Sequence, residues 1–448
     1  MNVFEAPFTS ALARQLAPDL LDRFTRYVRV DTQSHRDRDG SPSTPGQLEL
    51  ARMLVAELQA AGLTDADLDE NGYVTATLPE AGLADSGPEG GSPAPVMGLL
   101  AHLDTSPDAP GRGVEPIVHR AYDGGLIDLP RAGTRLDPAR MPELTDKRGH
   151  DIITASGDTL LGADDKAGMA EIMAAVAHLA SHPELPRPAI RVAFTPDEEI
   201  GLGASLLDLE RFGAAFAYTL DGSRLGEIQD ESFNALEAIL TVHGVEVHPG
   251  DAAGKMVNAL GLAARVVAEL PPGLSPERTS GRAGFIHPYE LSGHVDTAML
   301  RAILRDFDDA KVQGYAELLA DTAQRVLAGH PNARHELEVR RQYRNMRPYL
   351  EAAPQVIAAA EAAIRAEGIE PVRNPIRGGT DGSQLSERGL PTPNIFTGGH
   401  EYHSVREWAS LQEMAAAAAT IVHLAEVWTR PEFAAAPLPS PSAARVGS

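Results

Sequence analysis

Three short apolar runs in this sequence each lead directly into acidic residues or histidine, and this arrangement constrains the fold most. VMGLLA precedes His102 and Asp104, IRVAFT precedes the acidic segment 197–199, and FAYTL precedes Asp221. Between the first two runs, MAEIMAAVAHLA has apolar residues at helical spacing. Strand, helix and strand in this order, with polar groups after each strand, predict an α/β layer whose functional site lies at the carboxyl ends of the strands.

The length and the changes in pattern along the chain predict two domains. A chain of 448 residues is too long for one ordinary hydrophobic core. From about Glu231 to Asn345 the sequence changes to alternating stretches around a helix, which indicates a smaller α+β domain. We therefore predict a first domain in two parts (1–230 and 346–430), an inserted domain (231–345) and a disordered Pro/Ala/Ser-rich tail (431–448).

Composition excludes several classes of function. The chain has no cysteine, so any metal site must use His, Asp and Glu side chains. A net charge of −24 disfavours nucleic acid and anionic membranes as partners. We find no export signal and no apolar run long enough to cross a bilayer, and we therefore expect a cytoplasmic enzyme.

The segment TPDEEIG places Asp197, Glu198 and Glu199 side by side, where their charges repel one another. This repulsion is tolerable if cations lie nearby, and carboxylates are common ligands of divalent metals. We assign no role to Asp197 and interpret it as a polar turn residue.

The other candidate residues each have an ordinary explanation when taken alone. His102 and Asp104 share one face of an extended chain, but a capping Asp beside a surface His would give the same pattern. The pair Asp164 and Asp165 could cap the following helix, and Asp221 could belong to a turn with Gly222. Two further histidines, His400 and His403, lie in the Gly-rich segment GGHEYHS.

Taken together, these segments predict a metal centre. In an α/β domain their ends converge on one edge, where they supply the mixed N and O ligands that two zinc ions need in a cysteine-free protein. One glutamate of TPDEEIG can then bind metal while its neighbour accepts a proton from a metal-bound water.

Longer segments form an ordered series from about Leu20 to Trp428: HLDTSPD, LLGADDKAGMAEIM, TPDEEIG, YTLDG, VHPGDAAGKMVNAL, LRDFD, IRGGTDGSQLSERGLPTPNIFTGG and EYHS. In this order they resemble the motifs of the aminotripeptidase (peptidase T) branch of the M20 di-zinc metallopeptidases. The resemblance implies an α/β exopeptidase catalytic domain with an inserted α+β lid domain. It also implies removal of the N-terminal residue from tripeptides, and a homodimer formed through the lid.

Carried over by position, the resemblance also implies the roles of individual residues. It implies two zinc ions, for which cobalt could substitute, with His102 and Asp221 on one, Glu199 and His403 on the other, and Asp164 bridging both. Glu198 would be the general base that activates a zinc-bridging water, and Asp104 would orient His102.

Substrate selection, by the same resemblance, involves His248, Arg305 and Arg377, with Asn258 as a weaker candidate. A guanidinium suits the C-terminal carboxylate of a peptide. The alternative for Arg305 is an ion pair with a neighbouring acid, Asp306 or Asp308.

One departure from the family pattern follows His403. Family members often carry Gly-Lys there, whereas this chain has Ser404 and Val405 and then Arg406, so a basic contact is lost or moved to Arg406. Two alternatives to the tripeptidase stay open. A dipeptidase, carboxypeptidase or N-acyl amino-acid deacylase would share the metal ligands, and an inactive peptide-binding protein could keep them without the base.

Overall fold

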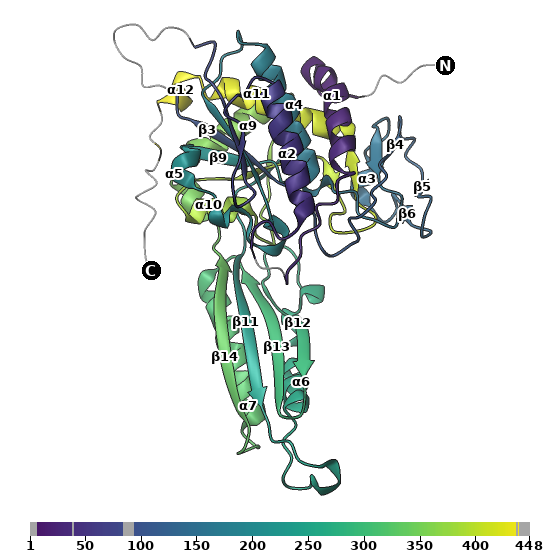
Figure 1. Ribbon diagram of the computed structural model, residues 1–448, viewed down its shortest axis with the longest axis vertical. Coiled ribbons are helices and arrows are strands. Elements are labelled where there is room, and N and C mark those ends of the chain that lie inside the picture. Colours follow the sequence, from purple (N-terminus) through teal and green to yellow (C-terminus); the bar gives the residue numbers. More distant parts are fainter. Residues whose placement is uncertain (1–6, 38–39, 84–93, 436–437, 439–448) are drawn as a thin grey trace. The chain divides into compact units, whose positions relative to one another are not determined.

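The computed structural model describes residues 7–37, 40–83, 94–435 and 438. It divides into two compact units, which Figure 1 shows coloured along the chain. The described residues up to 230, with 346–374 and those from 380 onward, form the first unit. The second unit comprises residues 231–345 and 375–379, so its chain is inserted into that of the first.

The first unit is built on an eight-stranded sheet with the strand order β1-β2-β8-β3-β9-β16-β10-β15. Its centre is parallel, because β3 pairs in parallel with both β8 and β9, and β16 pairs in parallel with β9. In sheet order the strands are β1 (Asp67–Leu68), β2 (Val74–Leu78), β8 (Ile190–Thr195), β3 (Met97–His102), β9 (Phe216–Thr219), β16 (Asn394–Ile395), β10 (Glu227–Gln229) and β15 (Val372–Arg373).

Helices pack against this sheet. Because they shield its central strands from water, those strands consist of the apolar runs seen in the sequence. All six residues of β3 are buried, as expected of a strand with both faces packed. Helix α4 packs on β3, α9 on β10 and α10 on β9, while α1, α4 and α11 pack against one another. The helices are α1 (Ala11–Tyr27), α2 (Pro45–Ala60), α4 (Ala163–Ser181), α5 (Leu209–Phe212), α8 (Arg347–Glu351), α9 (Pro354–Ala366), α10 (Asp381–Glu387) and α11 (Leu411–Val427).

A smaller four-stranded sheet in the same unit has the order β17-β18-β7-β4. Its strands are β17 (Gly399–His400), β18 (Trp408–Ser410), β7 (Ile152–Thr154) and β4 (Ile117–His119), and beside them lie α3 (Pro142–Thr145) and the hairpin β5 (Ile127–Asp128) and β6 (Arg135–Leu136). The pairing of β17 with β18 fixes both ends of the turn that contains His403.

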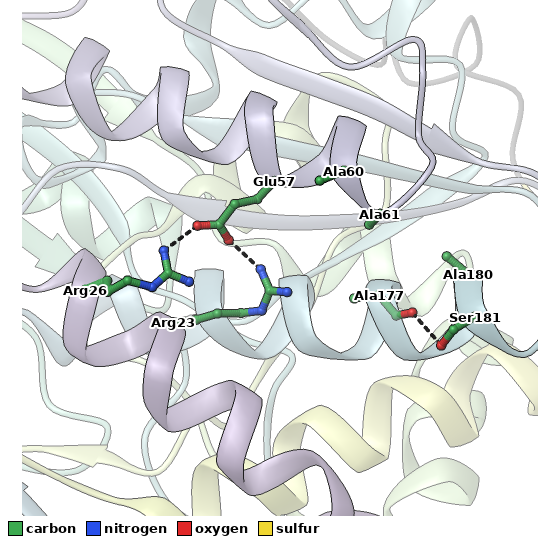
Figure 2. Close-up of a pocket in the computed structure, with 8 residues that line it drawn as sticks. All are labelled: Arg23, Arg26, Glu57, Ala60, Ala61, Ala177, Ala180 and Ser181. Atoms are coloured by element: carbon green, nitrogen blue, oxygen red, sulfur yellow. Dashed lines mark hydrogen bonds and ion pairs between the residues drawn. The ribbon is translucent and has the colours of Figure 1, made fainter.

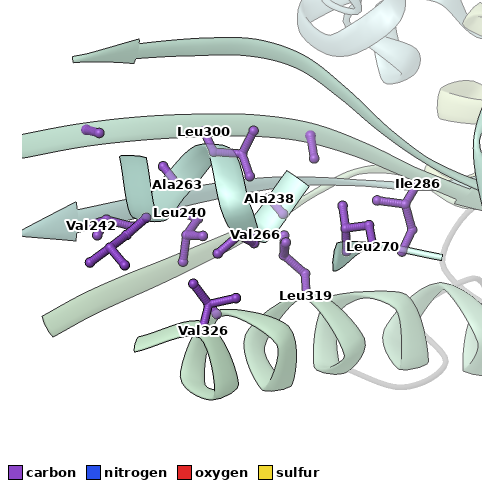
Figure 3. Close-up of a cluster of buried hydrophobic side chains, with 14 of the residues drawn as sticks. Ala238, Leu240, Val242, Ala263, Val266, Leu270, Ile286, Leu300, Leu319 and Val326 are labelled. Carbon is purple, nitrogen blue, oxygen red and sulfur yellow. The ribbon is translucent and has the colours of Figure 1, made fainter. Parts of the chain in front are cut away.

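The second unit is an antiparallel sheet with two helices on one face. The strand order is β12-β13-β11-β14, and residues of β13 alternate between buried and less buried positions. Figure 3 shows Leu240 and Leu300 of the sheet facing Val266 of α6 and Leu319 and Val326 of α7. The elements are β11 (Asn234–His243), α6 (Ala259–Glu269), β12 (Phe285–Gly293), β13 (Thr297–Asp306), α7 (Asp309–Leu327) and β14 (Arg334–Tyr343).

The segment 431–448, predicted to be disordered, begins with the short helix α12 (Pro431–Ala434). The prediction was therefore wrong for these first residues, whose backbone forms a turn of helix beginning at Pro431, a favoured first position. Residues 436–437 and 439–448 lie outside the described part of the chain.

No helix within the described ranges is both long enough and apolar enough to cross a membrane.

Candidate metal centre

The register of the central strands brings the ends of β3, β8 and β9 to the same edge of the sheet. His102, the last residue of β3, pairs with Thr195, the last residue of β8. Leu100 pairs with Thr219 at the end of β9, so Asp221 follows at the level of His102. The carboxyl edge of a parallel sheet is where α/β proteins place functional groups.

Two further segments complete the cluster: Asp164 belongs to the first turn of α4, and His403 lies between β17 and β18. His102 Nε2 is 2.9 Å from Asp164 Oδ1 and 3.9 Å from Asp221 Oδ1. His403 Nε2 is 3.3 Å from Asp164 Oδ2 and 3.0 Å from Glu199 Oε2. The two oxygens of Asp164 therefore face two different imidazoles, and the structure brings all five predicted metal ligands together.

Asp104 connects the cluster to the glutamate pair. Its Oδ1 accepts a hydrogen bond from Glu198 N at 2.9 Å, and its Oδ2 accepts one from Glu199 N at 3.1 Å. His102 Nδ1 is 3.0 Å from the backbone carbonyl oxygen of Asp104 and 3.5 Å from its carboxylate. The carbonyl therefore makes the closer contact with the imidazole, while the carboxylate holds the backbone of both glutamates.

Burial governs the electrostatics of the carboxylates. It raises the pKa of Glu198 well above its usual range, and the charge of Asp221 adds to this effect. Burial likewise raises the pKa of Asp221, together with the charges of Asp164 and Asp165. Burial and the charge of Asp164 raise the pKa of Glu199 to about 7. These carboxyl groups cannot all be ionised at neutral pH without additional positive charge.

The imidazoles supply part of that charge in the metal-free protein. Burial alone would lower the pKa of His403, but its hydrogen bonds with Asp164 and Glu199 raise it to about 12. Burial alone would raise the pKa of Asp164, but its hydrogen bonds with His102 and His403 lower it. In the described part of the chain, no lysine or arginine forms an ion pair with the five candidate ligands.

The donor atoms fit divalent cations. Two triplets, His102 with Asp165 and Asp221, and His102 with Asp164 and Glu199, each bring one ligand atom per residue within 4.8 Å of one another. Glu199 Oε1 is buried and has no hydrogen-bond partner among the described residues. A buried carboxylate oxygen without a partner is costly, and a bound cation would remove that cost. Imidazole and carboxylate ligands suit zinc.

A model of peptidase family M20/M25/M40 matches residues 160–427. The chain belongs to this family. It is 47% identical over 411 residues to Peptidase T of Geobacillus thermodenitrificans, covering 92% of this chain and 98% of that protein. It is 46% identical to Peptidase T of Bacillus subtilis over 91% of this chain and 98% of that protein. The resemblance found in the motifs is thus confirmed, and the chain is a metallopeptidase.

Solved structures support the M20 fold. Aminopeptidase PepT from Bacillus cereus has a TM-score of 0.69 at 23% identity, covering 92% of this chain and 99% of that one. A dinuclear metal-binding M20 peptidase from Bacillus subtilis has a TM-score of 0.61 at 14% identity, covering 92% and 98%. The predicted fold class, an α/β exopeptidase with a smaller α+β domain, is confirmed.

The four residues predicted to bind substrate all lie in the second unit, and three of them have local partners. His248 Nδ1 accepts a hydrogen bond from Gly250 N, and Asn258 caps α6 by accepting one from Gly261 N. The guanidinium of Arg377 donates to Thr279 and to the carbonyl oxygen of Ala283.

Arg305 differs from Arg377. Both guanidinium groups lie over aromatic rings, and both Nε atoms are buried without a hydrogen-bond partner, but among the described residues only Arg377 donates through its terminal nitrogens. The alternative that Arg305 pairs with a neighbouring acid does not hold, because Asp306 accepts from Tyr315 and Asp308 caps α7. Of the two arginines, Arg305 is thus the one available to a ligand.

The residues that depart from the family pattern after His403 interact with their own neighbours in the same turn. Ser404 Oγ donates to the carbonyl oxygen of Glu401 at 2.7 Å and accepts from Arg406 N at 3.1 Å. Arg406 lies 3.9 Å from Glu401. His400 does not join the cluster: it is buried, stacked on Trp408 and bonded to Glu413.

Sequence reasoning missed Glu407. Its carboxylate accepts hydrogen bonds from the backbone amides of Leu161, Gly162 and Asp164, at 2.7, 2.8 and 3.0 Å. It therefore fastens the segment that carries Asp164 to the segment that carries His403. A side chain that binds only backbone amides leaves no pattern in the sequence that could have revealed it.

The hollow drawn in Figure 2 lies elsewhere in the first unit. It has a volume of about 430 Å³ and is lined by α1, α2 and α4, and there Glu57 pairs with both Arg23 and Arg26. It shares no residue with the metal centre, and the charges on its wall are already paired.

Proposed function

We propose that this peptidase is an aminotripeptidase that releases the N-terminal residue from tripeptides and depends on two zinc ions. One observation carries the proposal: Asp164 lies between two imidazoles, one of which also contacts Glu199 of the glutamate pair. Relatives named Peptidase T, matched over nearly their whole length, support the substrate class. We also propose that the enzyme acts in the cytoplasm, and forms a homodimer through its second unit. Its strongly negative charge disfavours nucleic-acid and membrane partners.

The proposed ligands are His102 and Asp221 for one ion, Glu199 and His403 for the other, and Asp164 for both. This set combines neutral imidazoles with carboxylates, and it would accept Co²⁺ in place of Zn²⁺. When bound, such ions supply Lewis acidity, which polarises a carbonyl oxygen and lowers the pKa of water.

Glu198 is proposed as the general base. Its carboxylate accepts the proton of the attacking water and then donates it to the nitrogen of the leaving amine. Burial raises the pKa of this carboxyl group, because the charged form is poorly solvated, and bound cations would supply the positive charge that keeps it ionised and able to accept a proton. Asp104 holds the backbone amide of Glu198, which fixes the position from which the carboxylate acts.

A panel of substrates tests the function. We expect hydrolysis of Ala-Ala-Ala, with much slower hydrolysis of Ala-Ala and of N-acetyl-alanine, measured as release of free amine. Faster hydrolysis of the dipeptide or of the acetylated residue would instead assign a dipeptidase or a deacylase. If the metal-loaded protein hydrolyses none of these substrates, the remaining alternative is an inactive peptide-binding protein.

Arg305 is proposed to bind the C-terminal carboxylate of the substrate. Arg305→Ala should lower kcat/KM on Ala-Ala-Ala by about 10- to 100-fold, since a charge-assisted contact contributes roughly 1.5–3 kcal/mol. The same variant should hardly change the rate on Ala-Ala-Ala amide, which lacks the carboxylate. Arg377→Ala is the matched comparison, because its guanidinium is already bonded within the second unit. Equal rates of the unmutated enzyme on the free acid and the amide would contradict carboxylate recognition.

A further inference from the structure

We propose that Asp197, the acid of TPDEEIG without a chemical role, is a positioning residue that holds Glu198 in place. The inference rests on the proposed role of Glu198 as the base. Asp197 is fully buried and stands immediately before Glu198, in a turn that also carries the candidate ligand Glu199.

The carboxylate of Asp197 fastens this turn to the segment that begins α2. Its Oδ2 accepts a hydrogen bond from Ser43 N at 2.7 Å. Its Oδ1 accepts one from Ser43 Oγ and one from Gln47 Nε2, the latter at 2.7 Å. Gln47, also fully buried, returns the contact, because its Oε1 accepts from Asp197 N at 3.1 Å. The two residues thus bind each other in two places.

The backbone of Asp197 closes the turn on itself. Its φ of 61° lies in the left-handed region, which residues other than glycine adopt only at a cost in conformational energy. Its carbonyl oxygen accepts from Leu202 N at 3.0 Å and from Gly203 N at 3.1 Å. The contacts with Ser43 and Gln47 hold the residue in this conformation.

Glu198 is therefore held from both sides. Asp104 accepts a hydrogen bond from the Glu198 amide. On the other side, Asp197 directly precedes Glu198 and is hydrogen-bonded to Ser43 and to Gln47 of α2. A displacement of about 1 Å at a reacting group can lower a rate by about 10²-fold. The anchoring requires a carboxylate, since three donors converge on Asp197 and an amide could accept only on one side.

An exchange of the two polar groups tests the inference. Asp197→Asn alone directs an NH₂ group toward a donor, and Gln47→Glu alone places two carboxylates together. The double variant D197N/Q47E reverses the direction of their bond while keeping the backbone partner, because the introduced amide can donate to the introduced carboxylate and still accept from Ser43 N. Asp151→Asn is the control: Asp151 is a buried acid beside β7 that accepts from Ala121 N at 2.9 Å and pairs with Arg120, and it contacts neither Asp197 nor Glu198.

Activity is the first readout, with each variant loaded with zinc and assayed well below its unfolding temperature. We expect D197N to lower kcat about tenfold with KM within about twofold, and D197N/Q47E to recover most of that loss. Asp151→Asn should keep the kcat of the unmutated enzyme. If D197N does not fold, Gln47→Ala takes its place, since it keeps Asp197 but removes the partner on α2.

Amide hydrogen exchange of the metal-free protein is the second readout, and it needs no substrate. D197N should speed exchange in the peptide that covers residues 196–203, and the double variant should restore protection. A merely structural role predicts a lower unfolding temperature with unchanged kcat per folded molecule. That result, or unchanged exchange, would overturn the inference. If the unmutated protein cleaves no tripeptide, the proposed function is wrong. The exchange data would still test whether Asp197 holds the turn in place.

Discussion

Glu198→Gln should lower kcat on Ala-Ala-Ala by about 10²- to 10⁴-fold while leaving the metal content unchanged. The amide has the shape of the carboxylate but cannot accept the proton, so the loss falls on the chemical step. Steady-state kinetics and metal analysis of the same preparation measure the two quantities together.

Glu199→Gln is the matched control for Glu198→Gln. The two residues are adjacent, both amides are held by Asp104, and only the side chains differ in what they face. Glu199→Gln should weaken the binding of one metal ion, and excess zinc should restore part of its activity. Near-normal turnover in both variants would refute the division of roles between the two glutamates.

Removal of the metals should abolish activity, and addition of Zn²⁺ or Co²⁺ should restore it with about two equivalents bound per chain. Metal that binds only the folded protein also stabilises it, by about 2.7 kcal/mol when its free concentration is about 100 times Kd. Chelation should therefore lower the unfolding temperature as well. A fully active preparation without metal would exclude this centre as the catalytic site.

The affinity for metal should rise with pH. In the metal-free protein the pKa of Glu199 is raised to about 7 and that of His403 to about 12, so at neutral pH Glu199 is about half protonated and His403 carries its proton. Metal must displace those protons, and each unit of rising pH makes the displacement easier. Titration calorimetry in two buffers with different ionisation enthalpies should show proton release on binding.

The sequence predicted parts of the centre that carry chemistry, because His or acidic residues directly follow three apolar runs whose ends meet at one edge of an α/β sheet. His102 and Asp221 could be recognised in this way, whereas Asp164 and His403 could be recognised only in combination with them, and the structure places all four together. The α/β layer, whose centre the structure shows to be parallel, was predicted from the same runs. The units were less well defined, because residues 375–379 join the second unit from a position that the pattern assigned to the first.

The supporting contacts could not be predicted. Asp197 reads as a turn residue, and its left-handed φ agrees with a turn, but its burial depends on a segment 150 residues earlier. Glu407 binds only backbone amides, which every residue except proline has. For Arg305, the nearby acids in the sequence suggested an ion pair, whereas Asp306 and Asp308 are used by α7.

The position of β16 has a consequence for the order in which the protein can be made. This strand lies between β9 and β10 in the sheet, yet 165 residues separate Asn394 of β16 from Gln229 of β10. At about 5–20 residues per second, the ribosome delivers β16 roughly 8 to 33 seconds after its neighbours. Until then β9 and β10 each have an edge without a partner, and such edges recruit other chains. Chains released between residues 380 and 394 are therefore expected to aggregate, although the second unit, with its own core, is already complete.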